Sequence, residues 1–261
     1  MSRAVLVLID GVRPDALSET YCPTLERLRR EGSWTYKASS VMPTVTLPCL
    51  MSIFHGVLPA RHGVMSNNWA GMVRPVPGLI EVAAGAGLRC GAFYNWEPLR
   101  NLSLPNSLAV SYFWNAGDKD LGGDQRILDE AIRQIEREGP DFAFVYFGSV
   151  DIAGHKFGWM SQEYLNQLAH VDGLLGDLLS HLGGEETVLV LSDHGGHERG
   201  HGSGAPEDMV VPWFMVGPRI RRGWEIEREV SLIDAAPTLA KAMGIAPHVE
   251  WEGRVVEEVF V

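Results

Sequence analysis

The sequence predicts an α/β fold, a three-layer α/β/α sandwich around a mostly parallel central sheet. Three apolar runs without alternation, Arg3–Ile9, Phe142–Phe147 and Val188–Leu191, are typical of strands covered on both faces, as in a parallel sheet. Amphipathic helical patterns lie between these runs. No repeat, low-complexity segment or linker interrupts the 261 residues, so we expect a single domain over residues 1–261.

The composition limits the classes of function. Hydrophobic residues make up 46% and charged residues 21%, which supports a sizeable core rather than disorder. The net charge of −11 disfavours binding of a nucleic-acid polymer and favours a small anionic substrate held by a local positive site. Three cysteines without metal spacing or a disulfide framework are expected to be reduced core thiols. Without a signal sequence or an apolar segment of membrane-spanning length, we expect a cytoplasmic protein that contacts no membrane.

The remaining elements follow from apolar spacing and from helix start and stop signals. Leucines at 25 and 28, with charges between them and Gly32 after them, indicate a short helix over Pro23–Glu31. Ser161 as the N-cap residue opens the longest helical pattern, Ser161–Leu182. The other expected helices are Leu47–Phe54, Pro77–Gly87, Asp124–Glu138 and Leu232–Met243, the last with Pro237 in its first turn, and the other expected strands are Leu88–Tyr94, Leu108–Trp114 and Val210–Val216.

Acidic residues follow the three buried strands. Asp10, Asp151 and Asp193 each come after one of them, at the edge of a parallel sheet where ligands bind. Histidines follow closely: His155, His194 and either His197 or His201. Carboxylates and imidazoles in equal number are the ligands of a pair of zinc-like ions with open coordination positions. One Asp–His pair is weak evidence, but the pattern occurs after three strands.

A second informative stretch runs from Met42 to Asn68. Thr44 and Thr46 precede Pro48 at the amino end of an expected helix, where backbone N–H groups favour negative charge. A threonine there is either an N-cap residue or, beside a metal, a nucleophile, because coordination lowers the pKa of a hydroxyl. Asn67 lies in the loop that follows.

Taken together, these motifs resemble the alkaline phosphatase superfamily, and within it the type I phosphodiesterase/nucleotide pyrophosphatase branch. The resemblance spans nearly the whole chain and the motifs occur in the family's order. They are LIDG at 8–11, PTVTLP at 43–48, PARHGVMSNN at 59–68, DIAGH at 151–155, SDHG at 192–195 and HGS at 201–203.

The resemblance implies an alkaline phosphatase-like fold, two divalent metal ions and a role for each matching residue. The ions expected are zinc first, with manganese as the alternative. Thr46, the second threonine of PTVTLP, matches the nucleophile, and Asn67 matches the asparagine that binds a non-bridging phosphoryl oxygen. His201 is preferred to His197 because its HGS matches the family's order. The implied ligands are Asp151, His155 and His201 for one ion, and Asp10, Asp193, His194 and the Thr46 oxygen for the other.

The predicted function is metal-dependent hydrolysis of a phosphodiester or pyrophosphate bond in a nucleotide-like small molecule, through a covalent threonine intermediate. Cys49 and Leu50 stand where relatives in this branch carry Asn-His, which puts the substrate assignment in question. The alternatives on the same metal core are hydrolysis of phosphate monoesters, phosphonates or sulfate esters. An inactive metal-binding scaffold and a phosphomutase or phosphotransferase are the other rivals. Trp69, Trp96 and Trp159 are interpreted first as packing residues and second as stacking partners for a base or aryl group.

Overall fold

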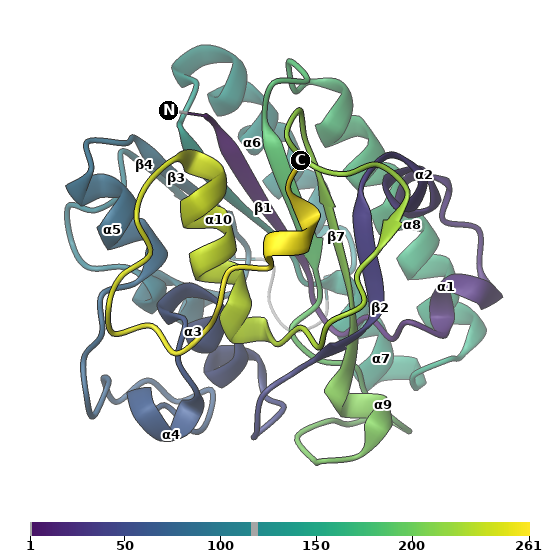
Figure 1. Ribbon diagram of the computed structural model, residues 1–261. Helices are drawn as coiled ribbons and strands as arrows, with labels where there is room; N and C mark the ends of the chain where they lie inside the picture. The colour runs from purple at the N-terminus through teal and green to yellow at the C-terminus, as the bar shows by residue number, and fades with distance from the viewer. Residues whose placement is uncertain (1, 116–119) are drawn as a thin grey trace.

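The computed structural model describes residues 2–115 and 120–261 and contains one eight-stranded sheet (Figure 1). The strand order is β4-β3-β5-β1-β6-β7-β2-β8. β7 pairs antiparallel with both of its neighbours, and every other pairing is parallel. The strands are β1 Ala4–Ile9, β2 Ser33–Ser39, β3 Cys90–Tyr94, β4 Val110–Phe113, β5 Phe142–Phe147, β6 Thr187–Leu191, β7 Val210–Val216 and β8 Trp224–Glu225.

Helices cover both faces of this sheet. The α-helices are α1 Ala16–Glu19, α2 Pro23–Glu31, α3 Thr46–His55, α4 Pro59–His62, α5 Leu79–Gly85, α6 Gly123–Glu138, α7 Ser149–Phe157, α8 Gln162–Ser180, α9 Pro206–Met209 and α10 Ala235–Met243. Short 3₁₀ turns cover Glu97–Leu102, Leu232–Asp234 and Glu257–Val259.

Alternate residues of β1 enter the two halves of the core. Leu6 and Leu8 pack with α3, α5 and α10, whereas Val5, Val7 and Ile9 pack with α2, α6 and α8. Figure 1 shows α10 in front of the sheet and α6 behind it. All six residues of β1 are buried, because both faces of the strand are covered. The predicted three-layer α/β/α sandwich is therefore confirmed.

Most expected elements are present, some with different ends. The strands at 142–147 and 210–216 and the helix at 23–31 match residue for residue, and Ser161 accepts a hydrogen bond from Tyr164 N as the N-cap of α8. The helix expected over 77–87 covers only Leu79–Gly85, and the one expected over 232–243 starts as a 3₁₀ turn. The short helix α4 lies between α3 and the loop that holds Asn67.

β2 and α7 are the longest described elements that were not predicted, and the short elements α1, α4, α9 and β8 were not predicted either. In β2, Ser33, Thr35 and Ala38 are buried and the other residues are partly or fully exposed, and the strand joins the sheet through the antiparallel β7. Helix α7 begins directly after β5, so Asp151 lies in the first turn of a helix rather than in a loop. The three cysteines are buried and unpaired, as expected of core thiols. Among the described residues no helix is long and apolar enough to cross a bilayer.

Candidate active site

The site forms where the carboxyl ends of three neighbouring strands meet. β1 lies between β5 and β6, with Ile9 beside Phe147 and Leu8 beside Leu191, so the three strands end at one edge. The loops and the helix that follow these ends carry the three aspartates that the sequence singled out. The edge is the place where parallel sheets bind ligands.

Three histidines reach this edge with the same orientation. Their Nδ1 atoms each face a backbone carbonyl oxygen: His155 faces Arg199 O at 2.9 Å, His194 faces Gly195 O at 2.8 Å, and His201 faces Thr44 O at 2.7 Å. Because a carbonyl only accepts, each imidazole must carry its proton on Nδ1. The Nε2 lone pairs are therefore free to bind a cation, with the ring held by the bond on its far side.

The Nε2 atoms meet carboxylate oxygens in two adjoining groups. In one, Asp151 lies 3.5 Å from His155 Nε2 and 3.6 Å from His201 Nε2. In the other, His194 Nε2 lies 3.3 Å from Asp10 Oδ1 and 3.4 Å from Asp193 Oδ2. Ligand atoms of Asp10, Asp151 and His194 also lie within 4.8 Å of one another, so Asp151 lies within reach of both groups.

One oxygen of each carboxylate in these groups lacks a donor among the described residues. Within the described residues, Asp10 Oδ1, Asp151 Oδ1 and Asp193 Oδ2 are buried without a hydrogen-bond partner. Burial raises the pKa of Asp10 well above its usual range, and the charges of Asp193 and Asp151 raise that pKa further. Burial likewise raises the pKa of Asp193 to about 8. Such clustered acceptors are costly alone and suit divalent cations, so the residues present fit two metal ions.

His197 lies outside both groups. Its Nδ1 donates to Asp208 Oδ1 at 2.7 Å, and Asp208 also accepts from the backbone and hydroxyl of Ser203. His197 is thus paired with Asp208 and does not face the cluster. Of the two histidines that the sequence left open, the structure brings His201 to the cluster.

Thr46 and Asn67 complete the predicted set. Thr46 is the first residue of α3, and its Oγ1 lies 3.2 Å from His194 Nε2. Thr44 instead bonds to the backbone of Ser203 and Gly202. Asn67 Oδ1 accepts from Leu47 N at 3.0 Å, which leaves its Nδ2 group as the available donor.

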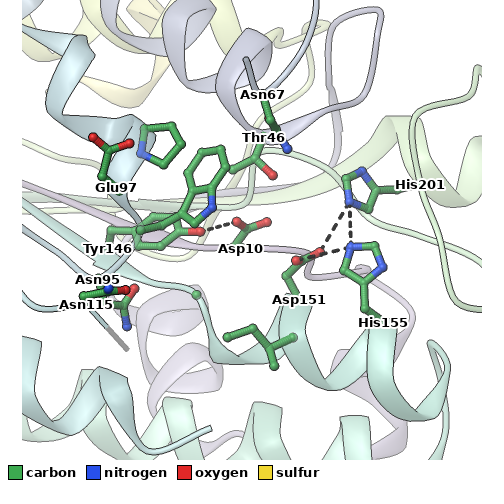
Figure 2. A pocket seen from close by; sticks show the side chains of 14 residues that line it. Asp10, Thr46, Asn67, Asn95, Glu97, Asn115, Tyr146, Asp151, His155 and His201 are labelled. Carbon is green, nitrogen blue, oxygen red and sulfur yellow. Dashed lines mark hydrogen bonds and ion pairs between the residues drawn. The ribbon is translucent and has the colours of Figure 1, made fainter. Parts of the chain in front are cut away.

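A cavity of about 350 Å³ opens beside these residues. Figure 2 shows Thr46 and Asn67 on one side of it and the Asp151, His155 and His201 group on another. Trp96, Pro98 and Ile152 supply its apolar wall. The described residues that line it are Asp10, Thr46, Asn67, Asn95, Trp96, Glu97, Pro98, Asn115, Tyr146, Gly148, Asp151, Ile152, His155 and His201.

Tyr146 is a site residue that sequence reasoning missed. Its hydroxyl donates to Asp10 Oδ2, and burial together with the Asp10 charge raises the pKa of this tyrosine well above its usual range. A Cβ on Gly148 would lie 2.8 Å from the Tyr146 ring, so the glycine makes room for it. The only available signal was a polar-tipped residue near the end of an apolar strand.

Asp124 is the second residue that the sequence did not reveal. It is fully buried, and its carboxylate accepts from Asn95 Nδ2 at 2.7 Å, Gly148 N at 3.0 Å and Ser149 N at 3.1 Å. It therefore joins the cavity wall at Asn95 to the start of α7. From the sequence, Asp124 was one charge among many in an amphipathic helix.

Comparison with known proteins shows where similar sequences occur. Residues 4–199 match the family model for type I phosphodiesterase/nucleotide pyrophosphatase. Human ectonucleotide pyrophosphatase/phosphodiesterase family member 1 is 26% identical over 221 residues, covering 73% of this chain and 23% of that protein. Venom phosphodiesterase of Naja atra is 24% identical over 74% of this chain and 26% of its own length. The chain thus spans about a quarter of the length of the curated relatives it matches.

Solved structures share the fold. Murine ectonucleotide pyrophosphatase/phosphodiesterase 5, an inactive threonine-to-alanine variant in complex with AMP, superposes with a TM-score of 0.85 at 14% identity and covers 100% of both chains. A phosphonate monoester hydrolase from Silicibacter pomeroyi gives a TM-score of 0.76 at 14% identity, covering 98% of this chain and 76% of that one. At this level of identity, the likeness concerns the fold.

Proposed function

The chain belongs to the type I phosphodiesterase/nucleotide pyrophosphatase family, and on this premise we propose that it is a two-metal hydrolase of phosphodiester or pyrophosphate bonds. The proposed substrate is a nucleotide-like small molecule, and the proposed nucleophile is Thr46. The curated relatives are named as phosphodiesterases and nucleotide pyrophosphatases, which supports a hydrolase.

One observation carries the proposal. The Thr46 hydroxyl lies 3.2 Å from His194 Nε2, and that nitrogen faces Asp10 Oδ1 and Asp193 Oδ2, so acceptor atoms cluster beside the hydroxyl. Bound cations would stabilise such a cluster of acceptors. A nucleophile beside bound cations fits transfer of an anionic phosphoryl group.

Each residue of the cluster has a proposed place. Asp151, His155 and His201 would hold one ion, and Asp10, Asp193, His194 and Thr46 would hold the other. When bound, two divalent ions lower the pKa of a coordinated hydroxyl and neutralise charge on the phosphoryl oxygens. Zinc is the first choice, because nitrogen and oxygen ligands suit it, and manganese is the alternative.

The protein's own groups supply orientation. α3 presents Thr46 Oγ1 to the cavity, and the bond from Leu47 N turns the Asn67 amide so that its Nδ2 donates to a non-bridging phosphoryl oxygen. Thr46 Oγ1 then forms a bond to phosphorus while the bond to the leaving group breaks. Water cleaves the threonine ester and restores the hydroxyl. The Tyr146 hydroxyl holds Asp10 in place by donating to Oδ2.

We expect the cavity to hold a flat part of the substrate next to the phosphorus. This part is either the leaving group or the group that stays on the phosphorus. Trp96, Pro98 and Ile152 offer apolar contact, and Asn95 and Asn115 offer polar contact. AMP is bound in the solved murine neighbour of the same fold, which supports a nucleotide-like ligand here. No membrane partner or nucleic-acid polymer enters this proposal.

The test compares hydrolysis of bis-p-nitrophenyl phosphate and p-nitrophenyl phosphate, with metal content measured on the same sample. We expect preference for the diester and about two metal ions per chain. Thr46→Ala is expected to abolish hydrolysis while largely retaining metal. Thr44→Ala is the matched control, because Thr44 lies two residues earlier in the chain and bonds to backbone instead.

Other outcomes redirect the proposal. Preference for the monoester, for a phosphonate monoester or for a sulfate ester would move the chain to the corresponding branch of the same metal core. Full activity of Thr46→Ala would overturn the proposed nucleophile, and a metal-free, inactive wild type would favour the scaffold alternative. The single domain over residues 1–261, the zinc identity and the cytoplasmic location stay predictions.

A further inference from the structure

Trp159 contacts both histidines of one metal-binding group. It lies in the short connection between α7 and α8, and its side chain is buried at 7% exposure. The indole meets the His155 ring edge-on at 5.1 Å between centroids and the His201 ring at 5.8 Å. His155 comes from α7 and His201 from the loop after β6, so one side chain packs against two segments that are distant in sequence.

The same tryptophan is bonded to the third segment of the site. Its indole N–H donates to Gly11 O at 2.9 Å, next to Asp10, and its backbone N donates to Glu198 O at 2.8 Å. Gly11 follows β1, whereas Glu198 belongs to the loop that carries His201. Trp159 therefore touches every segment that supplies a predicted ligand, except the amino end of α3.

Two glycines leave the space that the indole fills. A Cβ on Gly154 would lie 2.6 Å from the Trp159 ring, and a Cβ on Gly196 would lie 2.3 Å from it. Any side chain at either position would displace the ring or the backbone. The indole thus packs closely between α7 and the loop after β6.

We propose that Trp159 is a positioning residue that holds His155 and His201 in the geometry that binds metal. Each of these imidazoles bonds to a carbonyl through Nδ1, their Nε2 atoms lie 3.1 Å apart, and the His201 ring stacks on His194 at 3.7 Å between centroids. The indole is the packing partner that both rings share, so it restrains both at once. Because the two imidazole rings are already oriented in the metal-free protein, metal binding does not lose free energy in ordering them. The inference rests on the proposed metal-dependent function.

The test compares Trp159→Phe with Trp251→Phe. Trp251 is a close match, since it is 8% exposed, donates its indole N–H to Pro77 O at 2.8 Å and covers a glycine, Gly56. Its recorded ring contact is His248, which is no predicted ligand. Each variant loses one indole N–H···O bond and the same side-chain volume. Of the two tryptophans, only Trp159 contacts predicted metal ligands.

Zinc affinity is measured by competition with a chromogenic chelator, and folding by thermal unfolding of the metal-free proteins. Loss of outer contacts to metal-binding histidines costs about 10–100-fold in affinity. We expect a fall of this size in Trp159→Phe and an unchanged affinity in Trp251→Phe. Because Trp159 does not line the substrate cavity, kcat of Trp159→Phe should return close to the wild-type value at saturating metal, with KM unchanged.

The possible results distinguish failure of the role of Trp159 from failure of the proposed metal-dependent function. Equal zinc affinities for Trp159→Phe and wild type would overturn the role of Trp159 and leave the proposed function standing. A wild type that binds neither zinc nor manganese would overturn both. Should Trp159→Phe fail to fold, Trp159→Tyr keeps a larger ring in the same enclosure. An affinity of Trp159→Tyr equal to that of wild type would then count against the inference, and a reduced affinity with a wild-type unfolding temperature would support it.

Discussion

The hydrogen bond at Nδ1 distinguishes His201, the proposed metal ligand, from His197. His201 Nδ1 faces Thr44 O, so its Nε2 reaches Asp151, whereas His197 Nδ1 faces the buried carboxylate of Asp208. Removing a metal ligand costs more than the about 10–100-fold that loss of an outer contact costs. We therefore expect His201→Ala to lower metal content and diester hydrolysis by more than this.

His197→Ala is the matched control, since it removes the same side chain four residues earlier on the same loop. It should keep its metal, with activity close to that of wild type and a modest loss of stability from the broken pair with Asp208. Elemental analysis of dialysed samples, followed by the hydrolysis assay, distinguishes the variants. The reverse order of effects would show that His197 is the ligand.

His62 provides a prediction about pH. Val64 N donates to its Nδ1 at 3.0 Å, and Ser52 Oγ lies 3.2 Å from its Nε2, so the buried ring is held as the neutral form. Burial, together with the neighbouring His55, lowers the pKa of His62 from 6.5 to about 4.

Because the pKa of His62 is lower in the folded than in the unfolded chain, folding is favoured by loss of its proton. Its contribution to stability is complete above pH 6.5 and is lost as the pH falls from 6.5 towards about 4. Titration of the imidazole signals by NMR should show the His62 ring neutral at pH 5.5, which lies between these values. A midpoint near 6.5 would contradict the packing described for it.

At the residue scale, sequence reasoning found side chains that belong to short motifs and missed those that act through distant contacts. Asp10, Asp193, His194 and Thr46 stand within such motifs, and the structure brings them together. Tyr146 and Asp124 carry no local motif. Their roles arise only when β5 pairs with β1 and α6 packs on β5.

Helix α7 determines where Asp151 and His155 lie. Its first backbone N–H groups bond to the buried Asp124 carboxylate, which acts as a cap supplied by another helix, α6. Asp124→Ala leaves these donors and the Asn95 amide unpaired. We expect a loss of about 1–3 kcal/mol in the free energy of unfolding, because a buried donor left without a partner costs this much. Hydrolysis should fall as well, because α7 carries two predicted ligands.

Asp129→Ala is the control for this change. Asp129 is exposed on the same helix and bonds to Gln125 one turn away. Surface substitutions of this kind change stability by about 0.5 kcal/mol or less. Urea unfolding of both variants gives the comparison. Equal midpoints for the two variants would mean that α7 needs no cap from α6.

At the element scale, the hydrophobic pattern alone was enough to predict the buried strands and the long helices. β2 was not predicted because its sequence, SWTYKAS, mixes charged and aromatic residues. Its place in the sheet depends on pairing with β7. α7 was not predicted because its sequence, SVDIAGHKF, is short, contains Gly154 and lacks an apolar stripe. In both cases tertiary contacts rather than local preference determine the structure.

For the whole molecule, the order of the strands brings the separate motifs together in one candidate metal site. β5, β1 and β6 are adjacent in the sheet although they lie far apart in sequence. Parallel strands that are buried on both faces must end at a common edge, so the sequence was sufficient to predict that their aspartates meet. The sequence did not determine which histidine of the loop after β6 would reach them.

Metal removal should therefore destabilise the whole chain. Without cations, three buried carboxylate oxygens on Asp10, Asp151 and Asp193 lack donors among the described residues, and their charges repel. A cation that binds only the folded state contributes about 4 kcal/mol when its free concentration is a thousand times its Kd. For a chain of this size that is a rise in Tm of roughly 8–16 °C per ion. Chelation should lower Tm by this amount, and added zinc should restore it. The double variant His155→Ala/His201→Ala should lose part of the shift, because the other group remains. A Tm in wild type that does not respond to chelator or zinc would mean that the clustered carboxylates are stabilised in some way other than by metal.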